Sequence, residues 1–192
     1  MDYPRRDLPL PLELVNTTFA SAGQPCDALE SPDDLQAWLS ANAQRLPTLP
    51  PTSTPANVER FRTLRAALRR IFRAVFDATQ PSSDDIALLN AAAAAAPLFA
   101  RLDWDRLPRI TVIATSDAAT AALGAVAHDA IQLLGGPNMK LITPCQAPGC
   151  VLFFLREPRR RHWCSPACGN RARVARHYAR QRSETGLRAT TA

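Results

Sequence analysis

Long apolar segments are missing from this chain of 192 residues, and no run approaches the ~20 apolar residues that a helix needs to cross a bilayer. Its first residues, Met1 to Asp7, are mainly polar and charged and do not form an apolar secretory segment. We therefore expect a soluble, cytoplasmic protein without a membrane partner. Apolar residues still make up 46% of the chain, which is enough for one domain with a hydrophobic core and a smaller second module.

Sequence signatures of catalysis are missing as well. There is no Gly-rich phosphate loop after a strand, no nucleophile elbow, and no set of His and acidic residues at an accepted spacing. His128 and Cys26 have no evident reactive partner, so we expect a structural histidine and an ordinary free thiol in a loop. The sequence predicts a protein that is not an enzyme. A deep cleft with convergent polar groups would favour the alternative, an active site in the N-terminal part.

Lysine is almost absent, because Lys140 is the only one among 23 basic residues. Charge is also unevenly distributed: residues 1–139 carry 12 Arg against 15 acidic residues, whereas residues 140–192 carry 10 Arg and Lys140 against two Glu. The net charges of these parts are −3 and +9. The basic part predicts a polyanionic partner, with planar arginine forks available for phosphate or guanine contacts. The alternative is a solvated basic tail that binds nothing specific.

Cysteine is scarce, but four of the five cysteines form two close pairs with thirteen residues between the pairs. Zinc prefers four soft donors at tetrahedral corners, and two short Cys loops supply them at low entropic cost. Two disulfides would need an oxidising compartment, and redox pairs usually have two intervening residues instead of four or three. The spacing favours one structural Zn²⁺ ion with no coordination position open for catalysis. Its predicted ligands are Cys145, Cys150, Cys164 and Cys168.

Turn chemistry around these cysteines predicts a small β component. Pro148 presets φ, and Gly149 allows the backbone to bend back, so the loop between the first two cysteines is typical of a zinc knuckle. Residues 151–154 and 162–163 are predicted to form two short strands joined by a turn over residues 157–161. The result would be a hairpin between the two cysteine pairs.

The second cysteine pair marks the start of a helix. Ser165 is a suitable N-cap and Pro166 suits the first helical position, which places Cys164 just outside the helix and Cys168 in its first turn. The helical pattern continues through residue 182 and places Val174 and Tyr178 on one side. The opposite face is basic, with residues at i, i+3, i+4 and i+7 spacing: Arg173, Arg176, His177 and Arg180.

The motif from Trp163 to Arg173, WCSPACGNRAR, resembles the signature of the CGNR zinc finger family, which is named after the residues at positions 168–171. Proteins of that family typically carry an N-terminal ABATE domain of stress-induced transcription regulators. Residues 12–17, 35–39 and 64–69 are similar to patterns of that domain. The resemblance covers nearly the whole chain and implies a finger that binds DNA. The segment 155–161 departs from the family pattern, so contacts of that turn cannot be transferred.

The N-terminal part is predicted to be mainly helical. Periodicity leaves Leu12 to Phe19 open between strand and helix. Ser31 is the N-cap of a helix that places Trp38 in the core, and residues 47–55 are a proline-rich loop. The other predicted elements are helices over 57–78 and 86–96, a strand over 109–115, and a helix after the cap Ser116-Asp117 that ends at Gly135-Gly136-Pro137.

Arginines also line one face of the predicted helix 57–78. A solvated face, or a set of partners for nearby carboxylates, is the simplest interpretation of this pattern. The alternative is an anion or ligand site. Its candidate residues are Asn16, Arg65 and Arg69.

We therefore predict an α+β protein with an ABATE-like regulatory or sensor domain (1–140), a treble-clef-like zinc finger (141–183) and a flexible tail (184–192). The hypothesis is a transcription regulator whose finger helix binds double-stranded DNA, with a small-molecule effector and a homodimer as further expected partners. Asn170 and Arg171 either support the zinc site or contact DNA. The predicted DNA contacts are Arg173, Arg176, His177 and Arg180 on the helix and Arg159, Arg160 and Arg161 on the turn.

The alternative function is a zinc-dependent protein- or RNA-binding module, since fingers of this kind serve both uses. Sequence-specific RNA binding usually relies on exposed aromatic side chains that stack on unpaired bases. The aromatic residues of the finger are expected in its small core, which favours duplex DNA. They are Phe153, Phe154, Trp163 and Tyr178.

Overall fold

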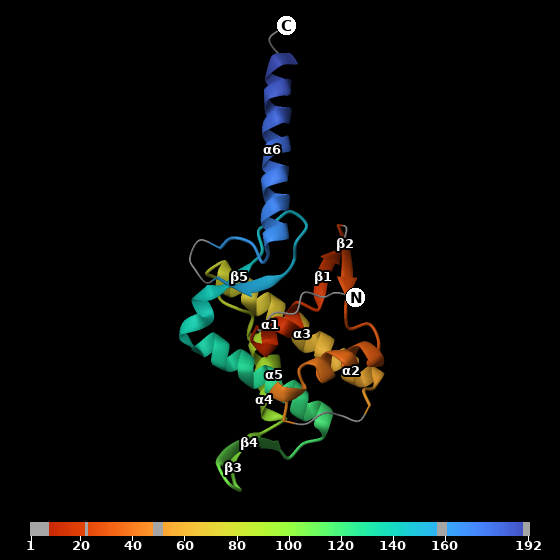
Figure 1. Cartoon of the computed structure of the whole chain (residues 1–192), viewed down its shortest axis with the longest axis vertical. Coiled ribbons are helices and arrows are strands. Elements are labelled where there is room, and N and C mark those ends of the chain that lie inside the picture. The colour runs from red at the N-terminus through yellow and green to blue at the C-terminus, as the bar shows by residue number, and fades with distance from the viewer. Residues whose placement is uncertain (1–7, 22, 48–51, 157–160, 190–192) are drawn as a thin grey trace.

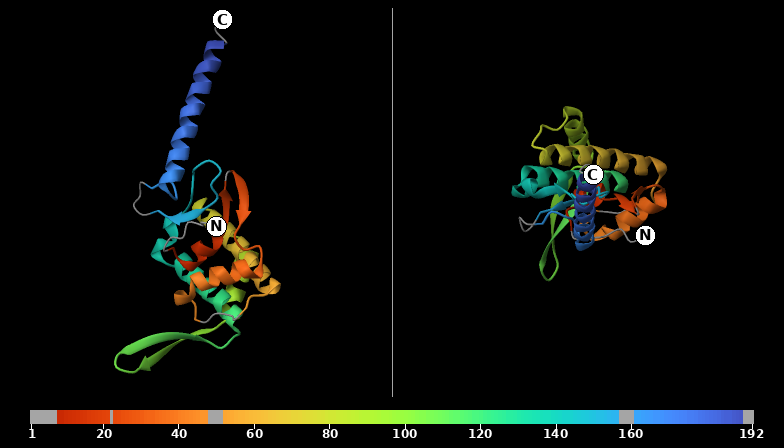
Figure 2. Two further views of the ribbon diagram at one scale, coloured as in Figure 1. Left: turned by 45° about the vertical axis from the view of Figure 1, so that its right-hand side comes forward. Right: turned by 90° about the horizontal axis from the view of Figure 1, so that it is seen from above.

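A helical body forms the centre of the protein, with a long helix projecting from one end and a two-stranded hairpin from the other (Figures 1 and 2). The computed structural model describes residues 8–21, 23–47, 52–156 and 161–189. These residues form helices and three separate two-stranded antiparallel sheets, so the predicted α+β class is confirmed. Within them, no helix combines the length and the apolar character that a membrane span requires.

The N-terminal segment that periodicity left open contains both kinds of structure. Helix α1 (Leu10–Val15) is buried over its whole length, and strand β1 (Thr18–Ser21) follows after a turn. Strand β2 (Gln24–Asp27) pairs with β1 in a register that places Thr18 opposite Asp27. A six-residue helix buried on all sides has no amphipathic period, which is why the sequence pattern was ambiguous here.

Helix α2 (Pro32–Ala41) begins as predicted. The Ser31 side chain accepts a hydrogen bond from the backbone N–H of Asp34, and the Asp34 carboxylate accepts one from the N–H of Ser31, which together form a capping box. Trp38 is buried and its ring meets Phe61 edge-on at 6.0 Å between centroids. The predicted core position of Trp38 is confirmed. A short 3-10 helix, η1 (Ala43–Arg45), follows.

Three longer helices carry most of the core. Helix α3 (Pro55–Phe76) packs against α4 (Ser83–Ala94) and α5 (Ala118–Gly135). The three predicted helices are confirmed, with ends that differ by only a few residues. The apolar stripe of α3 is buried as its 3.6-residue period implies. Its buried apolar members are Val58, Phe61, Leu64, Ala67, Leu68, Ile71 and Phe72.

A hairpin of strands β3 (Leu98–Trp104) and β4 (Pro108–Ala114) extends away from this core (Figure 2). Strand β4 was predicted, and its partner β3 was not. In the observed register, the residues at alternate positions of the two strands share one face that is entirely apolar. Leu102, Trp104 and Ile110 on that face have exposed fractions of 61%, 71% and 72%. The best strand pattern in the sequence therefore forms an exposed ribbon instead of a core strand.

The C-terminal part starts with a 3-10 helix, η2 (Pro137–Leu141), and continues as β5 (Ile142–Pro144), β6 (Phe153–Leu155) and α6 (Pro166–Ala189). Strand β6 pairs with β5 and not with residues 162–163, which are not in a strand. The predicted hairpin between the cysteine pairs is therefore wrong. Of the predicted turn over 157–161, residues 157–160 lie outside the described residues. His162 is exposed and Trp163 is only half-buried, so residues 162–163 have no buried face that a strand could pack against the core.

Candidate metal centre and basic helix

Four thiols come together where the β5–β6 hairpin meets the start of α6. The Sγ atoms of Cys145, Cys150, Cys164 and Cys168 all lie within 4.8 Å of one another. Sγ of Cys164 lies 3.8 Å from that of Cys150 and 3.5 Å from that of Cys168. These distances are far longer than the ~2.05 Å of a disulfide. The four residues are free cysteines, and two disulfides are excluded.

The arrangement fits a zinc ion. Four thiolates at the usual Zn–S distance of ~2.3 Å form a tetrahedron whose sulfur atoms lie about 3.8 Å apart. The observed separations of 3.5 and 3.8 Å match that edge. The site can therefore hold one Zn²⁺ ion, with the four predicted cysteines as its ligands. All four corners are protein thiolates, so the ion is structural.

Electrostatics also call for a cation. Hydrogen bonds from Cys150 and Cys164 lower the pKa of the Cys145 thiol to about 2. The hydrogen bond to Cys145 is the main cause that raises the pKa of Cys150 to about 11 and that of Cys164 even further. A thiolate on Cys145 thus disfavours a second thiolate on Cys150 or Cys164. Four thiolates this close require a divalent cation to compensate their charge, and its binding releases the remaining protons.

The loop that holds the first two cysteines is a knuckle between β5 and β6. The backbone N–H of Cys150 donates to the carbonyl of Ala147 at 3.0 Å, and that of Cys145 donates to Leu152 at 2.8 Å. Gly149 has a φ of +70°, a conformation that residues with a Cβ rarely adopt. The turn predicted at this position is confirmed, and it brings the two thiols to the same side.

The second pair lies at the N-terminus of α6, as the sequence predicted. Ser165 Oγ accepts a hydrogen bond from the backbone N–H of Cys168 at 3.2 Å, and α6 begins at the next residue, Pro166. The positive end of the helix dipole stabilises a thiolate at this point. A Cβ on Gly169 would lie 3.3 Å from the Trp163 ring, so the absence of a side chain allows close packing.

Arg171 and Asn170 have defined partners next to the metal site. The Arg171 guanidinium donates to Sγ of Cys168 at 3.2 Å, which offsets thiolate charge and orients the ligand. Asn170 accepts a hydrogen bond from Arg173 through its side-chain oxygen. Of the two roles left open by the sequence, Arg171 therefore has the contact expected of a residue that supports the zinc site.

The predicted DNA-contact residues fall into three groups. Arg173, Arg176, His177 and Arg180 are all exposed on α6. The guanidinium of Arg176 also lies 5.9 Å from the centre of the Trp163 ring. Arg161 instead turns inward: it donates to the carbonyls of Trp163 and Cys164 and lies over the ring of Phe154. Arg159 and Arg160 lie outside the described residues.

Tyr178 is not part of the finger core. Its exposed fraction is 59%, and that of Val174, one turn earlier, is 54%. The expectation that all four aromatic residues would be buried in the finger is wrong for Tyr178, because α6 extends beyond the residues that could cover it (Figure 1). Phe154 packs with the cysteines, whereas Phe153 belongs to the core of the helical body.

The three candidate ligand residues of the N-terminal part have protein partners. Asn16 pairs with the backbone of Phe153 through two hydrogen bonds of 2.8 Å, as a neighbouring strand would. Arg69 donates to the carbonyls of Val15 and Val151. Arg65 is buried and forms a bidentate ion pair with Asp27. Asn16 and Arg69 thus fasten the finger to the helical body, and a ligand role for the three residues stays a prediction.

A helical domain joined to a four-cysteine centre with a basic C-terminal helix defines this chain as a zinc finger protein with a large N-terminal domain. Residues 8–137 match the model of the ABATE family, described as "Putative stress-induced transcription regulator", and residues 142–181 match the CGNR zinc finger. The chain therefore belongs to the ABATE family and carries a C-terminal CGNR zinc finger, which confirms the resemblance seen in the sequence. Both families are of the regulator or zinc-finger type. A comparison with curated proteins found no match.

Proposed function

We propose that this protein is a transcription regulator that binds double-stranded DNA through α6. The observation that carries the proposal is the position of the basic face. Helix α6 has 24 residues, about 36 Å at 1.5 Å per residue, and projects from the body (Figure 1). Arg173, Arg176 and Arg180 are exposed on it. Residues 161–182 contain no Asp or Glu to neutralise them. The width of the major groove admits an α-helix, and a projecting basic helix suits that mode of binding.

The zinc centre gives the helix its anchor. Cys164 and Cys168 hold the first turn of α6, and the knuckle cysteines tie that turn to the β5–β6 hairpin. Beyond the first turn, Arg173, Arg176 and Arg180 follow one face and offer forked donors to phosphate oxygens and to guanine. The hydrogen bond to Asn170 partly preorganises Arg173, and the contact with the Trp163 ring does the same for Arg176. Preorganised side chains lose less entropy on binding.

Replacing Arg176 and Arg180 with alanine tests this assignment. We expect the affinity for duplex DNA to fall roughly 10- to 100-fold, and the slope of log affinity against log salt to decrease by about 2, because two phosphate or base contacts are lost. The measurement is fluorescence anisotropy with a labelled duplex from the upstream region of its own gene, beside a scrambled duplex, across a salt series. Zinc content should stay at one ion per chain.

The matched control is the double substitution of Arg106 and Arg109 with alanine. It removes the same charge from the β3–β4 hairpin, at the opposite end of the molecule (Figure 1). If both variants lose the same DNA affinity, the loss is a nonspecific effect of net charge, which would contradict a role for the basic face of α6. Stronger binding to single-stranded RNA than to duplex DNA would favour the alternative function, with exposed Tyr178 as a stacking platform. No binding to either at low salt would leave a protein partner as the function of the basic helix.

We further propose that the regulator is a homodimer formed through the β3–β4 hairpin. The apolar face of the hairpin, with Leu102, Trp104 and Ile110, is exposed, and an isolated two-stranded ribbon is only marginally stable in water. Ile110 and Val112 of this face also line a groove of about 610 Å³ against α1, η1 and α5. The same exposed apolar face on two copies is self-complementary, as a two-fold dimer requires. Two copies would also supply the contact area that one finger lacks on DNA.

Replacing Leu102 and Ile110 with threonine is expected to convert a dimer into a monomer. Threonine keeps the preference for β structure but removes the apolar surface that the second copy would bury. Light scattering after size-exclusion chromatography measures the mass directly. The control is Phe99→Thr on the opposite face of the same hairpin, which should leave the dimer intact. A monomeric wild-type protein, or a dimer that the double variant leaves unchanged, would contradict this interface.

A further inference from the structure

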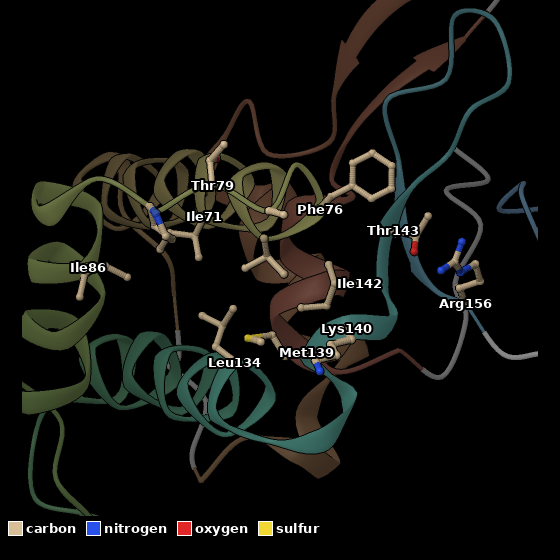
Figure 3. Close-up of a pocket in the computed structure, with 13 residues that line it drawn as sticks. Ile71, Phe76, Thr79, Ile86, Leu134, Met139, Lys140, Ile142, Thr143 and Arg156 are labelled. Atoms are coloured by element: carbon tan, nitrogen blue, oxygen red, sulfur yellow. The ribbon is translucent and has the colours of Figure 1, made fainter. Parts of the chain in front are cut away.

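An apolar pocket lies at the boundary between the helical body and the finger. It is enclosed by the C-terminal ends of α3 and α5, the start of α4, η2 and β5, and has a volume of about 590 Å³ (Figure 3). This volume is within the range of small-molecule sites, ~300–1,000 Å³. Neither the zinc centre nor the basic face of α6 contributes a residue to it.

The interior of the pocket is lined mainly by apolar side chains. Ile71, Leu134, Met139 and Ile142 point toward one another across the space (Figure 3). Phe76 borders it with 36% of its surface exposed. Met139 is unbranched and adapts its shape to a bound molecule. The lining therefore favours a ligand with a flexible hydrocarbon body.

One side of the pocket is positively charged. Lys140 of η2 and Arg156, which follows β6, both border it, and the described residues of its lining include no carboxylate. The Nε atom of Arg156 is buried and has no hydrogen-bond partner within the described part of the chain. A buried guanidinium donor without an acceptor is costly, and a bound anion would satisfy it.

We propose that this pocket binds a small amphipathic anion, with an apolar chain of about ten carbons between α3 and α5 and a single carboxylate at the buried Nε donor of Arg156. The apolar chain would cover the surface of Leu134, Met139 and Phe76, and the carboxylate would accept a hydrogen bond from Nε of Arg156. A neutral molecule of the same length lacks the hydrogen bond and the charge. A short carboxylate lacks the apolar contact.

The position of the pocket connects the ligand to the finger. Ile142 and Thr143 of β5 line it, and β5 ends at Pro144, one residue before the zinc ligand Cys145. Arg156 comes directly after β6, the strand on the other side of the knuckle. A ligand here would touch β5 and the residue that directly follows β6, the two strands next to the first cysteine pair. In the proposed function, which this second step assumes, it would be an effector that changes how the finger presents α6.

Calorimetric titration of the zinc-loaded full-length protein with decanoate, below its micelle concentration, tests the binding step without DNA. We expect saturable binding of one decanoate per chain, with decanol at least about tenfold weaker and acetate not detectable. Arg156→Gln should weaken decanoate about tenfold and leave decanol unchanged. The control is Arg106→Gln, which removes the same charge from the distant β3–β4 hairpin. It should leave the affinities for decanoate and decanol unchanged.

Substitutions that fill the pocket provide a second, independent test of decanoate binding. Leu134→Trp and Met139→Trp each place an indole in the space that the chain would occupy, so either variant that retains its zinc and its thermal unfolding transition should lose decanoate binding. Absence of decanoate binding to the wild-type protein, or binding that these variants leave intact, would overturn the proposal. The effect of decanoate on duplex affinity is measured separately. If the protein binds decanoate but no DNA, the proposed ligand site is supported and only the proposed function as a transcription regulator is contradicted.

Discussion

Replacing Cys164 with serine is expected to abolish zinc binding and to unfold the finger. Cys164 lies in the middle of the four-thiol cluster, with sulfur atoms of two other ligands at 3.5 and 3.8 Å. The cluster around the cysteines contains few other buried apolar residues, and the free energy of metal binding, about 10–16 kcal/mol for small zinc sites, is its folding free energy. Zinc content should fall from one ion per chain to none, and hydrogen exchange in the first turns of α6 should become fast.

The structure also predicts how far this unfolding extends. Ile142 and Phe153 of the β5–β6 hairpin belong to the core of the helical body, where the Phe153 ring packs edge-on against Phe72. Unfolding of the finger should therefore lower the melting temperature of the helical body without unfolding it, because the body loses the packing of these two side chains in its core.

The control for this substitution is Cys26→Ser. Cys26 lies in strand β2, paired with β1, and not in the predicted loop. It is far along the chain from the cluster, so this variant should retain zinc and stability. Retention of a full equivalent of zinc by the Cys164 variant, together with an unchanged melting curve, would contradict a four-cysteine site.

The second large effect is expected from Asp27→Asn, which should destabilise the protein by about 3–5 kcal/mol. Arg65 is buried on α3, and its guanidinium donates to both carboxylate oxygens of Asp27 at 2.5 and 2.6 Å and to Thr17 Oγ1 at 2.8 Å. An asparagine leaves the buried guanidinium without a compensating charge. Urea unfolding followed by circular dichroism measures the change in free energy.

The same pair makes stability depend on pH. Burial raises the pKa of Asp27, but the hydrogen bonds from Arg65 and from the Leu29 N–H together with the charges of Arg65 and Arg62 outweigh it, so the folded-state pKa lies below the ordinary value of 3.8. A carboxyl with a depressed pKa contributes its full stability above the unfolded-state value. This contribution is lost as pH falls below 3.8 and through the folded-state pKa. The wild-type protein should lose stability in that range more steeply than the Asn variant.

The double variant Asp27→Leu, Arg65→Met separates the charge effect from packing. Removing both charges leaves no uncompensated ion, so this variant should be more stable than Asp27→Asn alone. Equal destabilisation of the single and double variants would mean that the ion pair itself contributes nothing and that the loss comes from packing at β2.

Local sequence determined the parts of this protein whose chemistry is local. The four cysteines, the turn at Gly149 and the cap at Ser165 specified the metal centre, because ligand type and short loops constrain a zinc site without help from distant residues. The same holds for the capping box of Ser31 and for the apolar stripe of α3, which depend on neighbours within one helical turn or on a repeated period.

Only the tertiary structure decided which distant segments meet. It paired β6 with β5 instead of residues 162–163, left Tyr178 and the β3–β4 hairpin exposed, and directed Asn16 and Arg69 to the finger backbone. It also formed the pocket between Leu134 and Arg156, which belong to different parts of the chain. A residue's chemistry limits the partners that it can accept, but long-range packing selects among them, since burial depends on the whole chain and not on a local period.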